Sequence, residues 1–146
     1  MILYTMGFAQ KNAEKFFTLL QDNRVELLID IRLNNKSQLA GFTKGNDLAY
    51  FLKRLCNCAY MHCVEFAPTK EILDAYKKNA ISWDQYVERF LPLMDKRHAV
   101  ERFLSLATGY DRVCLLCSEP TPEQCHRRLL AEMIAKNAPD ITVVHL

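Results

Sequence analysis

Three short runs of apolar residues limit the folds open to this chain more than any other feature of its sequence. The runs cover residues 2–5, 25–31 and 113–117, and apolar residues dominate each of them. A strand with one face in water alternates apolar and polar residues, whereas a strand covered on both faces is a nearly continuous apolar run. The sequence therefore predicts a sheet whose central strands are buried on both faces.

Segments with helical spacing separate these runs. Apolar residues recur every three or four positions between residues 10 and 22 and again between 47 and 55, which is the period of an α-helix. The polar stretch 33–46 predicts a loop, and short strands are expected at about 59–63 and 141–144.

Capping residues mark the helices in the second half of the chain. Ser82 with Gln85 forms a capping box that starts a new helix. A break or bend is expected near Pro92, because proline removes a helical hydrogen bond. Thr121 followed by Pro122 predicts the start of the last helix.

Strands that alternate with helices, and that are apolar throughout, are typical of an α/β fold with a mainly parallel sheet. No linker rich in Pro, Gly or Ser and no internal repeat divides the 146 residues, a length that suits one domain. We therefore predict a single α/β domain over residues 1–146. It is a three-layer open sheet, mainly parallel, with helices on both faces.

The composition excludes several classes of protein. With 50% hydrophobic and 25% charged residues the chain is not wholly disordered, and no apolar stretch approaches the ~20 residues that span a bilayer. A formal net charge of +2 does not support a general polyanion binder. The first residues lack the basic and apolar regions of a secretory signal. We therefore expect the 6 Cys to be reduced thiols in the cytoplasm instead of a disulfide framework.

Polar residues follow the second apolar run at a place where α/β proteins bind ligands. In open α/β sheets the ligand lies beyond the carboxyl ends of the strands, where loops and helix starts meet. Asp30 and Arg32 stand at such an end, and the two-residue period of a strand puts both on the same side. They either reach the crevice or form a local ion pair, and the sequence leaves both open.

A larger polar group follows the third run. Cys117 and Glu119 leave the strand, and Cys125, His126 and Arg127 fall at the start of the next helix. Free N–H groups at a helix N-terminus favour a phosphate or carboxylate and lower the pKa of a nearby thiol. Arg127 could clamp such an anion with two hydrogen bonds. A packed cysteine, a core histidine and an arginine on a helix face are the alternative interpretation.

Two other roles for the cysteines stay open. Cys117 and Cys125 could approach each other across the strand–helix turn as a functional dithiol. A structural zinc site needs thiolates that converge from a turn, whereas Cys114 and Cys117 point to opposite faces of a strand. The remaining thiols are expected to be small buried hydrophobic residues. The zinc ligands would come from Cys114, Cys117, Cys125 and His126, or from Cys56, Cys58, His62 and Cys63.

At these residues the chain resembles the DUF488 family, whose reaction is not established. Residues 115–119 with 125–127 look like its LLCxE…CHR signature, and 30–32 with Ser37 resembles its DVR…S segment. Residues 67–71 and 81–86 look like its APTKE…SW stretch. The resemblance covers nearly the whole chain, and it implies an α/β fold with one common site. That site would combine Asp30, Arg32, Cys117, Glu119, Cys125, His126 and Arg127, with Ser37 as a further ligand-binding residue.

The chain departs from the family pattern at two places. Phe8 and Ala9 follow Gly7 where the family often has His and Ser, and Asn35 stands where proline is usual. If that His and Ser take part in the family's site, this part of the site is lost here.

The polar groups support an enzyme or binding protein for an anionic, phosphate-bearing ligand, such as a nucleotide or nucleic acid. The alternatives are a non-catalytic interaction module and a zinc-binding domain. Neither a P-loop nor a GxGxxG motif is present, and no cofactor is predicted. The candidate ligand-binding residues are Arg32, Ser37 and Arg127; the candidate catalytic residues are Asp30 or Glu119 as general base, His126 as acid or orienting group, and Cys117 or Cys125 as nucleophile.

Overall fold

The computed structural model of the protein describes residues 1–36 and 40–146, so that Ser37 lies outside the described residues. The strands are β1 (Ile2–Gly7), β2 (Leu27–Asp30), β3 (Ala59–His62), β4 (Arg112–Cys117) and β5 (Thr142–His145). The α-helices are α1 (Ala13–Asp22), α2 (Gly45–Phe51), α3 (Lys70–Lys77), α4 (Trp83–Lys96), α5 (Ala99–Leu106) and α6 (His126–Asn137). Short helical turns are η1 (Gly41–Thr43), η2 (Leu52–Cys56) and η3 (Val64–Phe66). In these two ranges no helix is long and apolar enough to cross a membrane.

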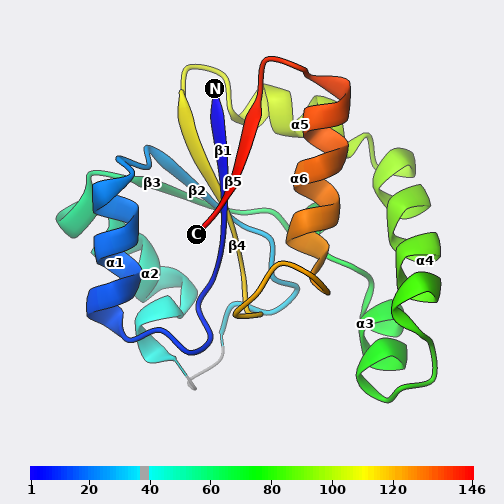
Figure 1. Ribbon diagram of the computed structural model, residues 1–146. Coiled ribbons are helices and arrows are strands. Elements are labelled where there is room, and N and C mark those ends of the chain that lie inside the picture. Colours follow the sequence, from blue (N-terminus) through cyan, green and yellow to red (C-terminus); the bar gives the residue numbers. More distant parts are fainter. Residues whose placement is uncertain (37–39) are drawn as a thin grey trace.

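All five strands form one parallel sheet in the order β3-β2-β4-β1-β5 (Figure 1). The central strands β1, β2 and β4 are buried over nearly their whole length, whereas the edge strands β3 and β5 are partly or mostly exposed. The continuously apolar runs are therefore the central strands, and the predicted α/β class with a mainly parallel sheet is confirmed.

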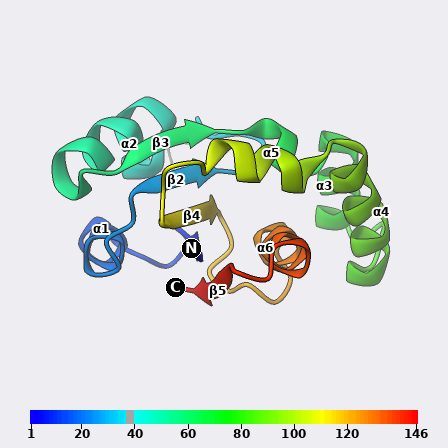
Figure 2. The same ribbon diagram turned by 90° about the horizontal axis from the view of Figure 1, so that it is seen from above.

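Helices cover both faces of the sheet and make three layers, as predicted (Figure 2). One face packs against α1, α2 and η2, and its core contains Phe16, Leu48 and Leu52. The other face packs against α4, α5 and α6, and its core contains Phe90 and Phe103. Each strand residue faces one of these two cores according to its place in the two-residue period.

The order of the strands places a crevice between β2 and β4. The chain leaves β2 through α2 on one face of the sheet and continues to β3 at one edge. It leaves β4 through α6 on the other face and continues to β5 at the opposite edge. Neighbouring strands whose connections diverge in this way leave a gap beyond their carboxyl ends, where α/β proteins bind ligands.

The structure differs from the sequence prediction at two helix ends. Helix α4 starts at the capping box of Ser82 but runs through Pro92, which is exposed, and the break comes at His98 with φ 53°. Because the carbonyl that loses its partner at Pro92 belongs to the exposed Glu88, water can satisfy it.

Helix α6 starts at His126 and not after Thr121. The segment before it is held by other parts of the protein: Phe8 and Ala9 donate backbone hydrogen bonds to Cys117 and Ser118. These contacts extend the β1–β4 ladder to Ser118. Beyond it, Arg127 donates to the carbonyl of Glu119 and Tyr76 donates to the side chain of Gln124, so contacts with other elements hold the segment that leads to α6.

The end of β1 is a point of close approach. Gly7 pairs with Cys117, and the chain that leaves β4 passes directly over Gly7. A Cβ atom at this position would overlap the carbonyl group of Glu119 and lie 2.7 Å from Nη1 of Arg127. Only glycine fits here without moving the backbone.

We predict that Gly7→Ala lowers the free energy of unfolding by about 2 kcal/mol, because the methyl group overpacks a rigid backbone crossing. Gly41→Ala is the matched control, since a Cβ there meets no atom within 4 Å. That substitution should change stability by less than about 0.5 kcal/mol. Urea unfolding measures both, and equal losses would contradict the close approach.

Candidate functional site

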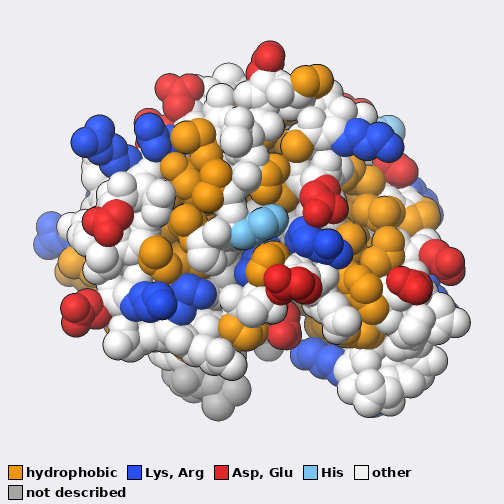
Figure 3. All heavy atoms as spheres, viewed as in Figure 1, with side chains coloured by type: hydrophobic (Ala, Val, Ile, Leu, Met, Phe, Trp, Pro, Cys, Tyr) orange, Lys and Arg blue, Asp and Glu red, His pale blue; other side chains and the backbone are white. Residues whose placement is uncertain are grey.

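A pocket of about 650 Å³ opens beyond the carboxyl ends of β2 and β4. The outline of the molecule is indented in this region, between the body of the sheet and helices α3 and α4 (Figure 3). The strand-end residues that line it are Arg32, Leu33 and Asn34 after β2, and Cys117, Ser118, Glu119, Gln124, Cys125 and His126 at the end of β4 and before α6. From the other side it is lined by Pro68, Lys70, Leu73, Asp74, Tyr76, Lys77, Asn79, Trp83 and Tyr86.

Cys117 is the last residue of β4, and its side chain faces α6 and the pocket. Cys114, three residues earlier, belongs to the core on the opposite face. The two thiols therefore point apart, as the strand period predicts. Cys125 is the residue before α6, and its Sγ lies 2.8 Å from Sγ of Cys117.

Three donors surround the sulfur of Cys117. Cys125 donates its S–H when Cys117 is ionised, Nη1 of Arg127 donates at 3.1 Å, and the backbone N–H of Glu119 adds a third hydrogen bond. Burial alone would raise the pKa of the Cys117 thiol, but these donors and the charge of Arg127 outweigh burial and lower the pKa. The site therefore makes the Cys117 thiol easier to ionise than a free thiol.

Arg127 is fully buried, and no carboxylate pairs with it in the described part of the chain. Its guanidinium donates to the hydroxyl of Thr5, the sulfur of Cys117 and the carbonyl of Glu119, and Nη2 has no partner in the described residues. No ion pair joins Arg127 to an acidic residue in the parts of the chain described. A buried cation needs a counter-charge. Of these three acceptors, the Cys117 thiol is the one that can become an anion.

The other five cysteines are shifted in the opposite direction. The hydrogen bond to Cys117 and burial raise the pKa of Cys125, which keeps that thiol protonated. Burial raises the pKa of Cys58 to about 12 and that of Cys63 to about 11. Burial also raises the pKa values of Cys56 and Cys114. The pKa of Cys117 is thus lowered in a protein whose other thiols resist ionisation.

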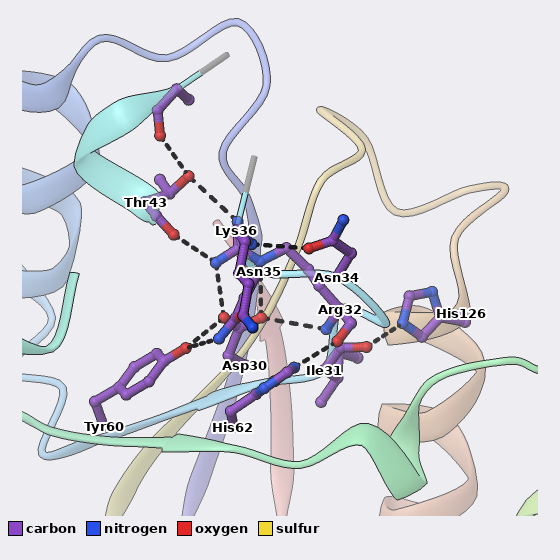
Figure 4. A network of polar contacts seen from close by, with 11 residues as sticks. Asp30, Ile31, Arg32, Asn34, Asn35, Lys36, Thr43, Tyr60, His62 and His126 are labelled. Carbon is purple, nitrogen blue, oxygen red and sulfur yellow. Dashed lines mark hydrogen bonds and ion pairs between the residues drawn. The ribbon is translucent and has the colours of Figure 1, made fainter. Parts of the chain in front are cut away.

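His126 presents a neutral imidazole to the pocket. Its Nε2 lies 2.9 Å from the carbonyl of Ile31, and because a carbonyl only accepts, Nε2 carries the proton (Figure 4). Burial lowers the pKa of His126 to about 4. The lone pair on Nδ1 has no hydrogen-bond donor within the described residues, so a pocket ligand can use it.

Asp30 and Arg32 form a buried ion pair next to the pocket (Figure 4). Arg32 donates from Nε and Nη2 to the two carboxylate oxygens at 2.8 and 2.7 Å. Nη2 also donates to the carbonyl of Thr43, and Tyr60 donates its hydroxyl to Asp30 at 2.7 Å. Both carboxylate oxygens are thus occupied. Of the pair, only Arg32 lines the pocket.

The two departures from the family pattern belong to this network. The ring of Phe8 lies 5.3 Å from Cζ of Arg32, a cation–π distance. Asn35 donates to the hydroxyl of Tyr60 at 3.0 Å, and its carbonyl accepts from the N–H of Gly45. Both residues therefore hold the strand-end network of Asp30 together.

The aromatic wall of the pocket was not among the predicted site residues. Trp83 stacks on Tyr86 at 5.0 Å, and Tyr76 lies 5.2 Å from Tyr86. The helical spacing of these rings is also that of core residues, and Phe90 in the same row is fully buried. The APTKE…SW stretch of the resemblance was the signal that could have identified Trp83 and Tyr86.

The structure brings most of the predicted site residues together. Arg32, Cys117, Glu119, Cys125 and His126 line one pocket, whereas Asp30 and Arg127 lie behind it and contact residues that do. In the ranges 1–36 and 40–146, no group of three or more Cys, His, Asp or Glu side chains could hold a metal ion.

The fold and the site define an α/β protein with a thiol pocket at the carboxyl edge of a parallel sheet. A family model described as "Domain of unknown function DUF488" matches residues 12–134, most of the chain. The protein belongs to this family. No curated protein and no solved structure matches the chain.

The lowered pKa of His126 leads to a prediction about the stability of the protein in acid. Because its pKa is about 4 in the folded protein and about 6.5 when unfolded, only the unfolded chain gains a proton as the pH falls between these values. We expect the free energy of unfolding to fall by about 2 kcal/mol between about pH 7 and about pH 4.5. Urea unfolding at a series of pH values measures this loss. It should persist in His98→Asn, which changes an exposed histidine, and should shrink in His126→Gln. An unchanged pH profile in His126→Gln would contradict the assignment.

Proposed function

We propose that this protein is an enzyme that binds an anionic small molecule in the pocket and uses the Cys117 thiolate as its nucleophile. The observation that carries the proposal is the contact of Cys117 with Arg127, a fully buried arginine without a carboxylate partner. Thiolates, not thiols, attack electrophilic centres. Burying a guanidinium costs free energy, and ionisation of the Cys117 thiol beside it offsets part of that cost.

The charges and rings of the pocket support a flat ligand that carries a phosphate. Arg32, Lys70 and Lys77 line it, against Asp74 and Glu119. Lys70 pairs with Asp74 at 3.2 Å, which leaves Lys77 for the ligand. The start of α6 adds backbone N–H groups at the same end of the pocket. The stacked rings of Trp83 and Tyr86 suit a planar group, and a nucleotide combines both features.

Each remaining residue has a role that fits its contacts. His126 orients the ligand by accepting a hydrogen bond at Nδ1, and Glu119 serves as general base at the pocket wall. Asp30 positions Arg32, because both of its oxygens are already hydrogen-bonded. Arg127 positions Cys117 and stabilises its charge. Ser37 stays a predicted ligand-binding residue on the basis of the family resemblance.

We also place the protein in a reducing compartment, the cytoplasm. All 6 Cys are free thiols, and a nucleophilic Cys117 must be kept reduced between turnovers. The zinc alternative receives no support from the side-chain arrangement described above.

Alkylation tests the nucleophile. We expect iodoacetamide to modify Cys117 before any other cysteine, with a pH midpoint below the ~8.5 of a free thiol. Peptide mass spectrometry gives the rate at each residue. Arg127→Gln should move the midpoint to higher pH, whereas Arg128→Gln, which changes the next and partly exposed arginine of α6, should leave it unchanged. A midpoint above that of a free thiol in the wild-type protein would overturn the proposal.

The same reaction tests the preference for anions. Iodoacetate carries a negative charge and iodoacetamide does not. The rate of iodoacetate divided by that of iodoacetamide at Cys117, normalised to the same ratio for a free thiol, therefore reports the local electrostatic potential. We expect a normalised ratio above one that falls on Lys77→Gln and on addition of a nucleoside monophosphate. A ratio below one would rule out an anionic ligand and leave the thiolate in place.

A further inference from the structure

Cys125 contributes a second thiol to the pocket, at 2.8 Å from the first. Its hydrogen bond helps to ionise Cys117, but many donors could do that. A thiol differs from other donors because it can also form a bond with an oxidised sulfur. The sulfur atoms need to move toward each other by less than about 1 Å to reach disulfide length.

We propose that Cys117 and Cys125 form a two-electron redox pair that reduces small organic hydroperoxides. This inference rests on the proposed nucleophile, Cys117. It adds a second activity, toward uncharged hydroperoxides, to the proposed reaction of an anionic ligand, and it assigns Cys125 as the resolving residue. It requires a small thiol or dithiol as the electron donor.

The reaction balances with these groups. The Cys117 thiolate attacks the terminal oxygen of ROOH, the O–O bond breaks, and RO⁻ leaves and takes a proton from water. Cys117 is now a sulfenic acid, S–OH. Once Cys117 carries no charge, the Cys125 thiol transfers its proton to the oxygen of the sulfenic acid. The resulting Cys125 thiolate attacks the Cys117 sulfur, the S–O bond breaks, and water leaves. Two equivalents of thiol then reduce the disulfide to the starting dithiol and become one disulfide themselves.

The position of the two sulfurs selects a small oxidant. Cys117 is 1% exposed and Cys125 is 3% exposed, and both line the pocket. A protein disulfide cannot reach them, whereas a molecule of the size of the pocket can. The rings of Trp83 and Tyr86 line the pocket, so a hydroperoxide with an apolar organic group gains contacts that hydrogen peroxide lacks.

The surroundings also favour reduction of the disulfide. When Cys117 enters a disulfide its negative charge disappears, and the buried Arg127 loses its counter-charge. The reduced form is therefore stabilised relative to the oxidised form, which makes the disulfide easy to reduce. Cys125 precedes α6 in extended backbone, so bond formation does not require a turn of that helix to unwind.

The experiment uses reduced protein with cumene hydroperoxide as substrate and dithiothreitol as electron donor. Without dithiothreitol, we expect cumene hydroperoxide to lower the intact mass of the protein by the mass of two hydrogen atoms. The peptide map should then contain a Cys117–Cys125 disulfide. Turnover should be faster with cumene hydroperoxide than with hydrogen peroxide. Failure to form this disulfide, with Cys117 oxidised to sulfinic acid instead, would overturn the redox pair.

Two alanine variants test whether turnover depends on Cys125 in particular or on any buried thiol. Cys125→Ala should stop at a Cys117 sulfenic acid that dimedone traps, and its turnover should fall by about tenfold or more. Cys114→Ala removes a buried thiol from the same strand but the opposite face, and it should turn over like the wild-type protein. Equal turnover in Cys125→Ala and wild type would contradict the assignment of Cys125.

Alkylation keeps the two proposals apart. If Cys117 reacts with iodoacetamide as a low-pKa thiolate but forms no disulfide with hydroperoxide, the redox pair is wrong and the nucleophile stands. If Cys117 reacts with neither reagent, the thiolate itself is wrong and both proposals fall.

Discussion

The contact between the buried guanidinium of Arg127 and the sulfur of Cys117 is the interaction on which the site depends. A charge enclosed by protein is tolerated only when it is paired and hydrogen-bonded. Arg127 achieves this without a carboxylate, by donating to Thr5 of β1, to Cys117 of β4 and to the carbonyl of Glu119 between β4 and α6. One side chain on α6 therefore holds the ends of two strands and the segment that leaves them, and Gly7 leaves room for this crossing.

A second buried arginine, Arg32, lies just beyond the end of the neighbouring strand β2, and the two arginines differ in the groups with which they pair. Arg32 pairs with the carboxylate of Asp30, and burial and hydrogen bonds leave that pair no free acceptor atom. Arg127 pairs with a sulfur that can form covalent bonds. The adjacent ends of β2 and β4 bring one member of each pair, Arg32 and Cys117, to the same pocket. The first pair fixes the geometry of the β2 end, whereas the proposed thiolate of the second loses its charge when its sulfur forms a covalent bond.

The local sequence pattern was enough to predict the sheet, because short, continuously apolar runs are typical of strands buried on both faces. The two-residue period of a strand also correctly placed Cys114 and Cys117 on opposite faces. The local pattern also placed Arg32, Cys117 and His126 at one edge, since parallel strands end together. It failed where contacts with distant residues hold the chain: α6 starts at His126 and not after Thr121, because Arg127 and Tyr76 bind the segment before it at Glu119 and Gln124. The aromatic wall was missed because Trp83 and Tyr86 lie on a helix face that also packs the core. Helical spacing in the sequence does not distinguish side chains that line a cavity from side chains on the same face that pack in the core.

In the proposed function, the charge of the Cys117 thiolate links the chemistry of the pocket to the stability of its support. A bond to the Cys117 sulfur removes this negative charge, and among the described residues Arg127 then has only neutral acceptors. The covalent intermediate is thereby destabilised relative to the free thiolate, by an interaction that contacts neither substrate nor solvent. Breakdown of the intermediate restores the ion pair. A buried arginine facing a thiolate thus favours turnover over a lasting adduct, and a carboxylate at the same position would have removed this bias by keeping Arg127 paired in every state.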